Sequence, residues 1–114
     1  MSDQARWIER GLLAISSEPQ KSAYLITVFG EMDGSNARDL EDELIRLGND
    51  GRSEIVLDLS QLEFIDSTGL AVILRAHHRM RNNGHSLSVV RPLQAQVGHA
   101  FVLSGLDTAL LFAQ

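Results

Sequence analysis

Several residue types are absent or scarce in this chain of 114 residues, and each absence excludes a class of function. There is no cysteine, which excludes disulfides, thiolate metal sites and a cysteine nucleophile. The four histidines lack the spacing of zinc ligands, so we expect no metal site. Lys21 is the only lysine and lies in a predicted loop, which argues against Schiff-base catalysis.

Long hydrophobic segments are missing as well. No apolar stretch has the length needed to span a bilayer, and the first ten residues, MSDQARWIER, lack the hydrophobic segment of a signal peptide. We therefore expect a cytoplasmic location without membrane contact. The formal net charge of −5 argues against direct binding of nucleic acid, because contacts to phosphate dominate that affinity.

The motifs of common enzyme families are also absent. The sequence has no GxGxxG after a predicted strand, no P-loop and no GxSxG. His77 and His78 are adjacent and point about 100° apart on a helix, so they do not chelate one ion. Asp58 lies inside a predicted strand and Asp66 at its end, which supports an acid–base pair only weakly. We expect no enzymatic activity and no bound cofactor.

The hydrophobic fraction of 44% is enough for the core of a single domain. Alternating and continuous apolar runs predict strands, the first two forming a hairpin, at 11–16, 23–30, 54–65 and 86–90. Apolar residues at helical spacing predict helices at 37–47, 70–83 and 97–104. This order predicts an α/β fold with a small mixed sheet of about four to five strands, flanked by helices.

Two of these helices have charged faces. In the first helix, the acidic residues Asp39, Glu41, Asp42 and Glu43 lie off the apolar stripe, near the helix start, where negative charge suits the helix dipole. In the second, Arg75, His78 and Arg79 form a polar stripe. That stripe is either a solvated helix face or a surface for an acidic partner.

The segment FIDSTGL, residues 64–70, stands where a predicted strand meets the second helix. Asp66 or Ser67 can cap the helix, which typically stabilises it by about 1 kcal/mol. Gly69 costs roughly 0.5–1 kcal/mol relative to alanine in a helix. We expect Gly69 to leave the backbone uncovered, so that a partner can approach the Ser67 hydroxyl. Phosphorylation there would add roughly −1.5 to −2 charges beside Asp66 and oppose binding without unfolding the domain.

Three segments resemble one known family. FIDSTGLAVILRAHHRMRNNG is similar to the signature segment of STAS domains, in particular of single-domain anti-sigma factor antagonists. VFGEMD resembles the G-E-x-D turn of that family, and SGLDTALLF resembles its C-terminal segment. The resemblance covers roughly residues 11 to 112. It implies a STAS domain over 11–114. Residues 1–10 lie outside the resemblance as an N-terminal extension, in which we expect Trp7 to be a surface anchor that covers a sheet edge and not a platform for a ligand.

The resemblance implies a bacterial partner-switching protein. The domain would bind an anti-sigma factor that is also a serine kinase, and binding would release a sigma factor for transcription. ATP and magnesium would belong to that kinase, which would phosphorylate Ser67, and a serine phosphatase would reverse the reaction. Asp33, Asp66, Thr68 and Gly69 would form the partner surface, with Asp33 also explicable as an ordinary turn residue. The chain would be a monomer or a weak dimer.

Some features leave alternatives open. Ala71 stands where many relatives of that family have a second glycine, and QVGHAF (96–101) where relatives usually have arginines. One alternative is a STAS subunit of a transporter or of another signalling complex that does not involve a sigma factor. An alternative of a different class is a small hydrolase that uses Ser67 as its nucleophile.

Overall fold

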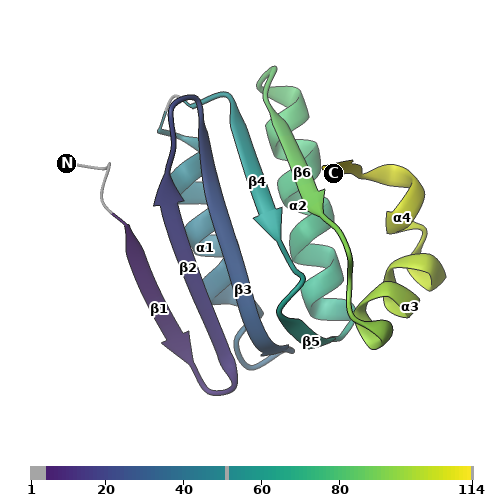
Figure 1. Cartoon of the computed structure of the whole chain (residues 1–114). Helices are drawn as coiled ribbons and strands as arrows, with labels where there is room; N and C mark the ends of the chain where they lie inside the picture. Colours follow the sequence, from purple (N-terminus) through teal and green to yellow (C-terminus); the bar gives the residue numbers. More distant parts are fainter. Residues whose placement is uncertain (1–4, 51, 114) are drawn as a thin grey trace.

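The computed structural model describes residues 5–50 and 52–113, which form one sheet backed by helices (Figure 1). The strands are β1 (Arg6–Arg10), β2 (Leu13–Pro19), β3 (Ala23–Met32), β4 (Glu54–Asp58), β5 (Leu62–Ile65), β6 (Ser86–Val90) and β7 (Leu111–Ala113). The helices are α1 (Ala37–Gly48), α2 (Ser67–Asn82), α3 (Ala95–Ser104) and α4 (Leu106–Ala109). The predicted α/β fold is confirmed.

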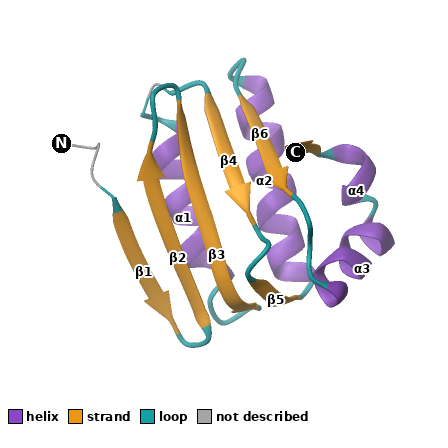
Figure 2. Cartoon of the chain, viewed as in Figure 1, coloured by secondary structure: helices purple, strands orange, loops and turns teal. Residues whose placement is uncertain are grey.

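The sheet is mixed, as predicted. Its strands follow the order β1-β2-β3-β4-β6-β7, and β5 pairs with the last residues of β3. β1, β2 and β3 are antiparallel neighbours, which confirms the predicted hairpin, whereas β4, β5, β6 and β7 run parallel to their partners. Parallel neighbours need crossover connections, and Figure 2 shows α1 and α2 making them on the same side of the sheet.

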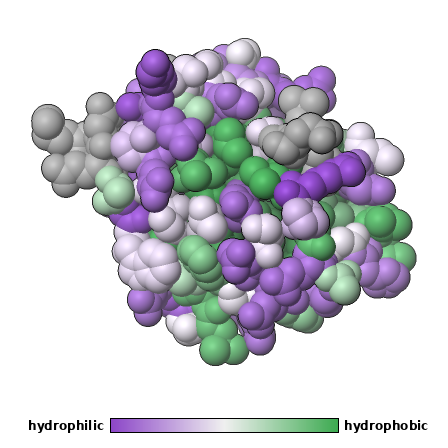
Figure 3. Space-filling model, viewed as in Figure 1, coloured by the Kyte–Doolittle hydropathy of each residue, from purple (hydrophilic) through white to green (hydrophobic). Residues whose placement is uncertain are grey.

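The hydrophobic core lies between the sheet and the two long helices. Alternate strand residues point toward α1 and α2 and are buried, among them Ile15, Ile26, Val28, Leu57 and Val89. The opposite face of the sheet is partly exposed, and Figure 3 shows apolar and polar atoms interspersed on it. In the described part of the chain, no helix combines the length and the apolar character needed to cross a bilayer.

Three short strands bring the sheet to seven within the described residues, above the predicted four to five. The predicted strand 54–65 is two strands, because Asp58 accepts hydrogen bonds from the amide and the hydroxyl of Ser60 (2.9 and 2.7 Å) and the chain turns there. β5 then pairs with β3 instead of continuing β4. β7 lies in the tail, whose type the sequence left open.

β1 lies in the predicted N-terminal extension and forms an edge of the same sheet (Figure 1). Its Trp7 ring lies 5.6 Å from the ring of Phe29 on β3, measured between centroids. Trp7 is 57% exposed and lies in the edge strand, which is compatible with the expected surface anchor, and Arg6–Arg10 is continuous with the sheet of the domain.

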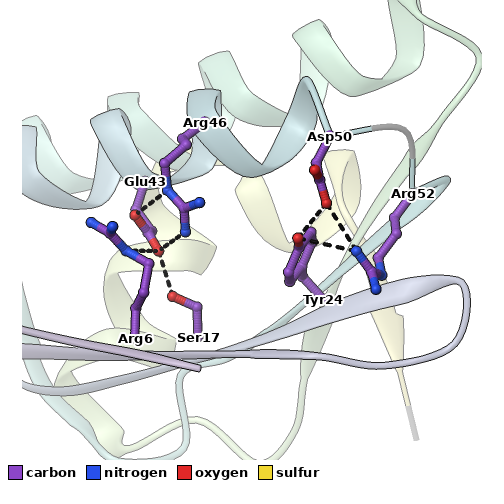
Figure 4. Close-up of polar contacts among 7 residues, drawn as sticks. All are labelled: Arg6, Ser17, Tyr24, Glu43, Arg46, Asp50 and Arg52. Atoms are coloured by element: carbon purple, nitrogen blue, oxygen red, sulfur yellow. Dashed lines mark hydrogen bonds and ion pairs between the residues drawn. The ribbon is translucent and has the colours of Figure 1, made fainter. Parts of the chain in front are cut away.

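Glu43 is buried, although it lies off the apolar stripe of α1. Its carboxylate is 2% exposed and accepts a hydrogen bond from the Ser17 hydroxyl at 2.5 Å (Figure 4). Arg46 donates to both carboxylate oxygens (3.1 and 2.8 Å), and Arg6 lies 3.4 Å away. These partners come from α1, β1 and β2, so the helical spacing of α1 alone did not reveal them.

A second polar cluster joins the start of β3 to the loop that follows α1 (Figure 4). The Tyr24 hydroxyl is hydrogen-bonded to Asp50, and Arg52 lies 2.9 Å from the same carboxylate. The Arg52 guanidinium also stacks over the Tyr24 ring, 4.6 Å from its centroid. Both clusters fasten α1 and its following loop to the sheet.

Candidate functional site

Ser67 is the first residue of α2, directly after the end of β5 and Asp66. Ser67 and Thr68 are exposed. The Ser67 hydroxyl makes no hydrogen bond to any other residue in the described segments. The expectation of an approachable hydroxyl at this junction therefore agrees with its placement in the fold.

Asp66 caps α2. Its Oδ1 accepts hydrogen bonds from the amides of Thr68 and Gly69, at 3.0 and 3.2 Å. The sequence left open whether Asp66 or Ser67 serves as the cap, and the carboxylate is the group that does so. Because Asp66 satisfies two of the unpaired amides of the first turn, the Ser67 side chain is not needed there.

The turn that contains Asp33 adjoins this junction. The amide of Gly34 donates to Asp66 Oδ2 at 3.2 Å, and a Cβ atom added to Gly34 would lie 3.6 Å from Thr68 Oγ1. The two loops for which the family resemblance implies a common surface are thus neighbours, although they lie more than 30 positions apart.

Asp33 itself is part of a hydrogen-bonded turn. Its Oδ1 accepts from the hydroxyl and the amide of Ser35, at 2.6 and 2.9 Å. The hydroxyl bond, followed by the amide bond, holds the pKa of Asp33 below its ordinary value. Asp33 therefore presents a negative charge at neutral pH next to the junction, and its role as a turn residue is also realised.

Gly69 is buried, and the expectation that it leaves the backbone uncovered is wrong. A Cβ atom at this position would lie 2.7 Å from Cγ1 of Ile65 and 3.2 Å from Cε of Met32. The glycine is required because the first turn of α2 packs closely on the end of β5. Any effect of Gly69 on a partner is therefore exerted through the placement of this turn.

Two residues that support the junction were missed at the sequence level. Asn36 is 3% exposed, accepts from the Asp33 amide at 2.9 Å and donates to the Glu31 carbonyl at 3.0 Å. Gln96 on α3 exchanges two hydrogen bonds with the backbone of Ile65, at 2.9 and 3.0 Å. Asn36 precedes a helix and was detectable as a turn residue, whereas nothing near Gln96 in the sequence indicated its contact with β5.

The polar stripe of α2 is partly engaged within the molecule. Arg75 donates two hydrogen bonds to Glu41 on α1, at 2.7 and 3.0 Å, and these lower the pKa of Glu41.

The two carboxylates considered as an acid–base pair have separate partners. Asp58 accepts hydrogen bonds from Ser60, as described above, and Asp66 accepts from the first turn of α2. Within the described residues, no group of three or more histidine or carboxylate side chains is arranged to hold a metal ion.

The sequence of this chain is similar to a known protein family and to proteins of named function. The family model described as "Mlab, STAS domain" matches residues 15–112. The anti-sigma-B factor antagonist of Staphylococcus aureus is 28% identical over 94 residues, which cover 82% of this chain and 86% of that protein.

Solved structures share the fold. An anti-sigma factor antagonist from Mycobacterium paratuberculosis superimposes with a TM-score of 0.76 at 23% identity, covering 98% of this chain and 87% of the other. The Bacillus cell fate determinant SpoIIAA, solved in its phosphorylated form, gives a TM-score of 0.68 at 20% identity, covering 88% of this chain and 91% of the other.

Proposed function

Because the chain belongs to the STAS domain family, we propose that it is an anti-sigma factor antagonist whose binding is switched off by phosphorylation of Ser67. Its partner is an anti-sigma factor with serine kinase activity, which brings ATP and magnesium, and a serine phosphatase restores the binding form. The names of its relatives support the first part of the proposal. The observation that carries the second part is the exposed Ser67 hydroxyl without a described partner.

The docking surface comprises the first turn of α2 and the adjoining Asp33 turn. Thr68 is exposed beside Ser67, and Asp66 fixes the relative position of both loops through Gly34. A kinase that docks here reaches the hydroxyl of Ser67 without displacing an internal hydrogen bond. The surface is preorganised by the cap, which limits the entropy lost on binding.

The cap leaves few amides of α2 to bind a phosphate on Ser67, so the phosphate would act mainly on the partner. A helix N-terminus accommodates an anion through its free amides. Here the amides of Thr68 and Gly69 are already occupied by Asp66, and the amide of Asp66 donates to the Met32 carbonyl at 3.1 Å. A phosphate on Ser67 would add roughly −1.5 to −2 charges beside the carboxylates of Asp66 and Asp33. That local concentration of negative charge would repel acidic groups of the partner, and it would be unfavourable to bury beneath a closely fitting partner surface.

The proposal is tested by capturing the kinase from source lysate and incubating it with the purified chain, ATP and magnesium. We expect the chain to gain one phosphate, which mass spectrometry of peptides places on Ser67. Ser67→Ala should abolish the modification, and Ser53→Ala, at an exposed serine outside the junction, should leave it unchanged. Phosphate gained by Ser67→Ala would show that the assigned residue is wrong.

The charge mechanism is tested separately by binding measurements with the same kinase. Ser67→Ala should bind whether or not ATP is present, because it cannot be phosphorylated. Ser67→Asp should bind more weakly by at least tenfold, since a charge placed in a docked surface costs more than about 1.4 kcal/mol. Unchanged affinity of Ser67→Asp would remove the charge mechanism, while leaving the phosphorylation site intact.

A further inference from the structure

A cavity lies at the end of the molecule opposite to Ser67. It is lined by His77, Arg81, His85, Ser86, Leu87 and Ala109, and its volume is about 320 Å³. Ser86 begins β6 and pairs in register with Glu54 at the start of β4, whereas Ser67 follows the last residue of β5. The cavity is therefore lined by the C-terminal part of α2, the start of β6 and the end of α4, and Figure 1 shows β6 in front of α2.

The histidines of this cavity lack internal partners. His77 is 5% exposed, and its buried Nδ1 atom has no hydrogen-bond partner among the described residues. The Nδ1 atom of His85 is buried and likewise unpaired among the residues described. A buried polar atom without a partner is unfavourable, so two in one cavity call for a specific explanation.

The charge of the cavity is positive or neutral throughout. Arg81 supplies a guanidinium group, and no aspartate or glutamate is among the described residues that line it. Burial, followed by repulsion from His78 and Arg81, lowers the pKa of His77, so this ring is neutral at pH 7 and can either donate or accept. Glu54 lies opposite Ser86 in the sheet but does not line the cavity.

The remaining walls are apolar. Leu87 is buried in the core, and Ala109 closes the cavity from α4. A few polar groups converging on an apolar cavity of this size are typical of sites for small ligands.

We propose that this cavity binds a small organic anion, in which a carboxylate or phosphate pairs with Arg81 and an apolar body contacts Leu87 and Ala109. The imidazoles of His77 and His85 complete the site by hydrogen bonding to the ligand. Arg81 and His77 are four positions apart on α2 and so share one helix face. This site is separate from the Ser67 junction and does not depend on the function proposed for it.

The proposal is tested by ¹H–¹⁵N NMR titration of the full chain with three probes: phenyl phosphate, benzoate and benzyl alcohol. Both anions carry the same ring as the alcohol, so the alcohol reports the apolar contribution alone. We expect saturable shifts at Arg81, His85 and Ser86 with at least one anion, and affinity for the alcohol at least tenfold weaker. The anion that binds more tightly identifies whether the site takes carboxylates or phosphates.

Two variants and a matched control assign the contacts. Arg81→Gln should weaken binding of the anion about tenfold, because it removes a charged hydrogen bond. Arg38→Gln removes the same charge from an exposed position on α1 and should leave affinity unchanged. Ala109→Phe should block the cavity without altering its charge and abolish the shifts.

Three outcomes would overturn the proposal. They are the absence of saturable shifts with both anions, equal affinity for the alcohol and the anions, and equal effects of Arg81→Gln and Arg38→Gln.

Discussion

Ser17 and Ser67 are the same residue type in two opposite environments. Ser17 is 1% exposed, and its hydroxyl donates to Glu43 inside the molecule. Ser67 is exposed, and its hydroxyl has no partner among the residues described. The difference arises because β2 points Ser17 toward α1, whereas Asp66 takes over the capping that Ser67 would otherwise perform.

The carboxylates beside the two serines also differ in their environments. Burial raises the pKa of Glu43, but hydrogen bonds from Arg46 and Ser17 and the charges of Arg46 and Arg6 outweigh it, so the pKa lies below its ordinary value. Asp66 and Asp33 are instead partly open to solvent, and their partners are mainly backbone amides. A polar group that is fully engaged stabilises the fold, and one that is left open at the surface is available to a partner.

Removal of Glu43 should have the largest effect on stability. Glu43→Ala leaves Ser17 buried without its acceptor and separates Arg46 and Arg6 from their shared carboxylate. We expect a loss of about 2–3 kcal/mol in the free energy of unfolding, below the roughly 3–5 kcal/mol of a fully buried pair because both arginines retain access to water. Urea denaturation measures it, with Asp42→Asn as a control on the exposed face of α1. Equal effects of the two variants would contradict the structural role of the cluster.

The same cluster predicts how stability depends on pH. The folded-state pKa of Glu43 lies below the unfolded value of 4.5, so its contribution is complete above pH 4.5 and is lost as the pH falls through the folded-state value. The difference in unfolding free energy between the wild type and Glu43→Gln should therefore narrow as the pH is lowered below about 4.5. If the difference in unfolding free energy stayed constant as the pH fell to the point of acid unfolding, the charge on Glu43 would not contribute to stability.

Gly69→Ala tests the packing beneath the Ser67 junction. The new methyl group would meet Ile65 at 2.7 Å, and we expect destabilisation of about 1–2 kcal/mol from overpacking. Gly98→Ala is the matched control, because its methyl group has room beside Leu93 (3.8 Å) and alanine favours the helix by roughly 0.5–1 kcal/mol. Thermal unfolding of both variants should move in opposite directions, and stabilisation by Gly69→Ala would refute the close packing.

Asp66→Ala tests the cap. Two amides of α2 and the amide of Gly34 lose their acceptor, and we expect a loss of about 1 kcal/mol. Hydrogen exchange should quicken at Thr68 and Gly69, while the protection of the C-terminal half of α2 should change little. Unaltered exchange at these two amides would show that another group caps the helix.

The smallest effect is expected for Ser67→Ala, and it sharpens the contrast between the two serines. Loss of an exposed hydroxyl should change stability by less than about 0.5 kcal/mol. Ser17→Ala should cost about 1.5 kcal/mol, because it removes a hydrogen bond to a buried carboxylate. A destabilisation by Ser67→Ala as large as that by Ser17→Ala would mean that Ser67 is part of the structural network after all.

Much of the fold could be read from local patterns. Leu40, Leu44 and Leu47 mark the buried stripe of α1, and Gly105, with φ of +81°, ends α3 where expected. The strand–helix junction at Ser67 was also placed correctly. The edge strand β1 was not identified, because its exposed and charged residues give no apolar alternation and it forms only by pairing with β2.

The sequence by itself determined the order of the main elements and the position of the exposed Ser67 at the start of a helix. Both follow from hydrophobic periodicity and helix capping, which act over a few residues. Only the tertiary structure decided which polar groups are engaged. It buried Glu43 with Ser17, hydrogen-bonded Gln96 to Ile65 and placed Met32 against Gly69, since each of these contacts joins residues whose separation along the chain leaves no local pattern.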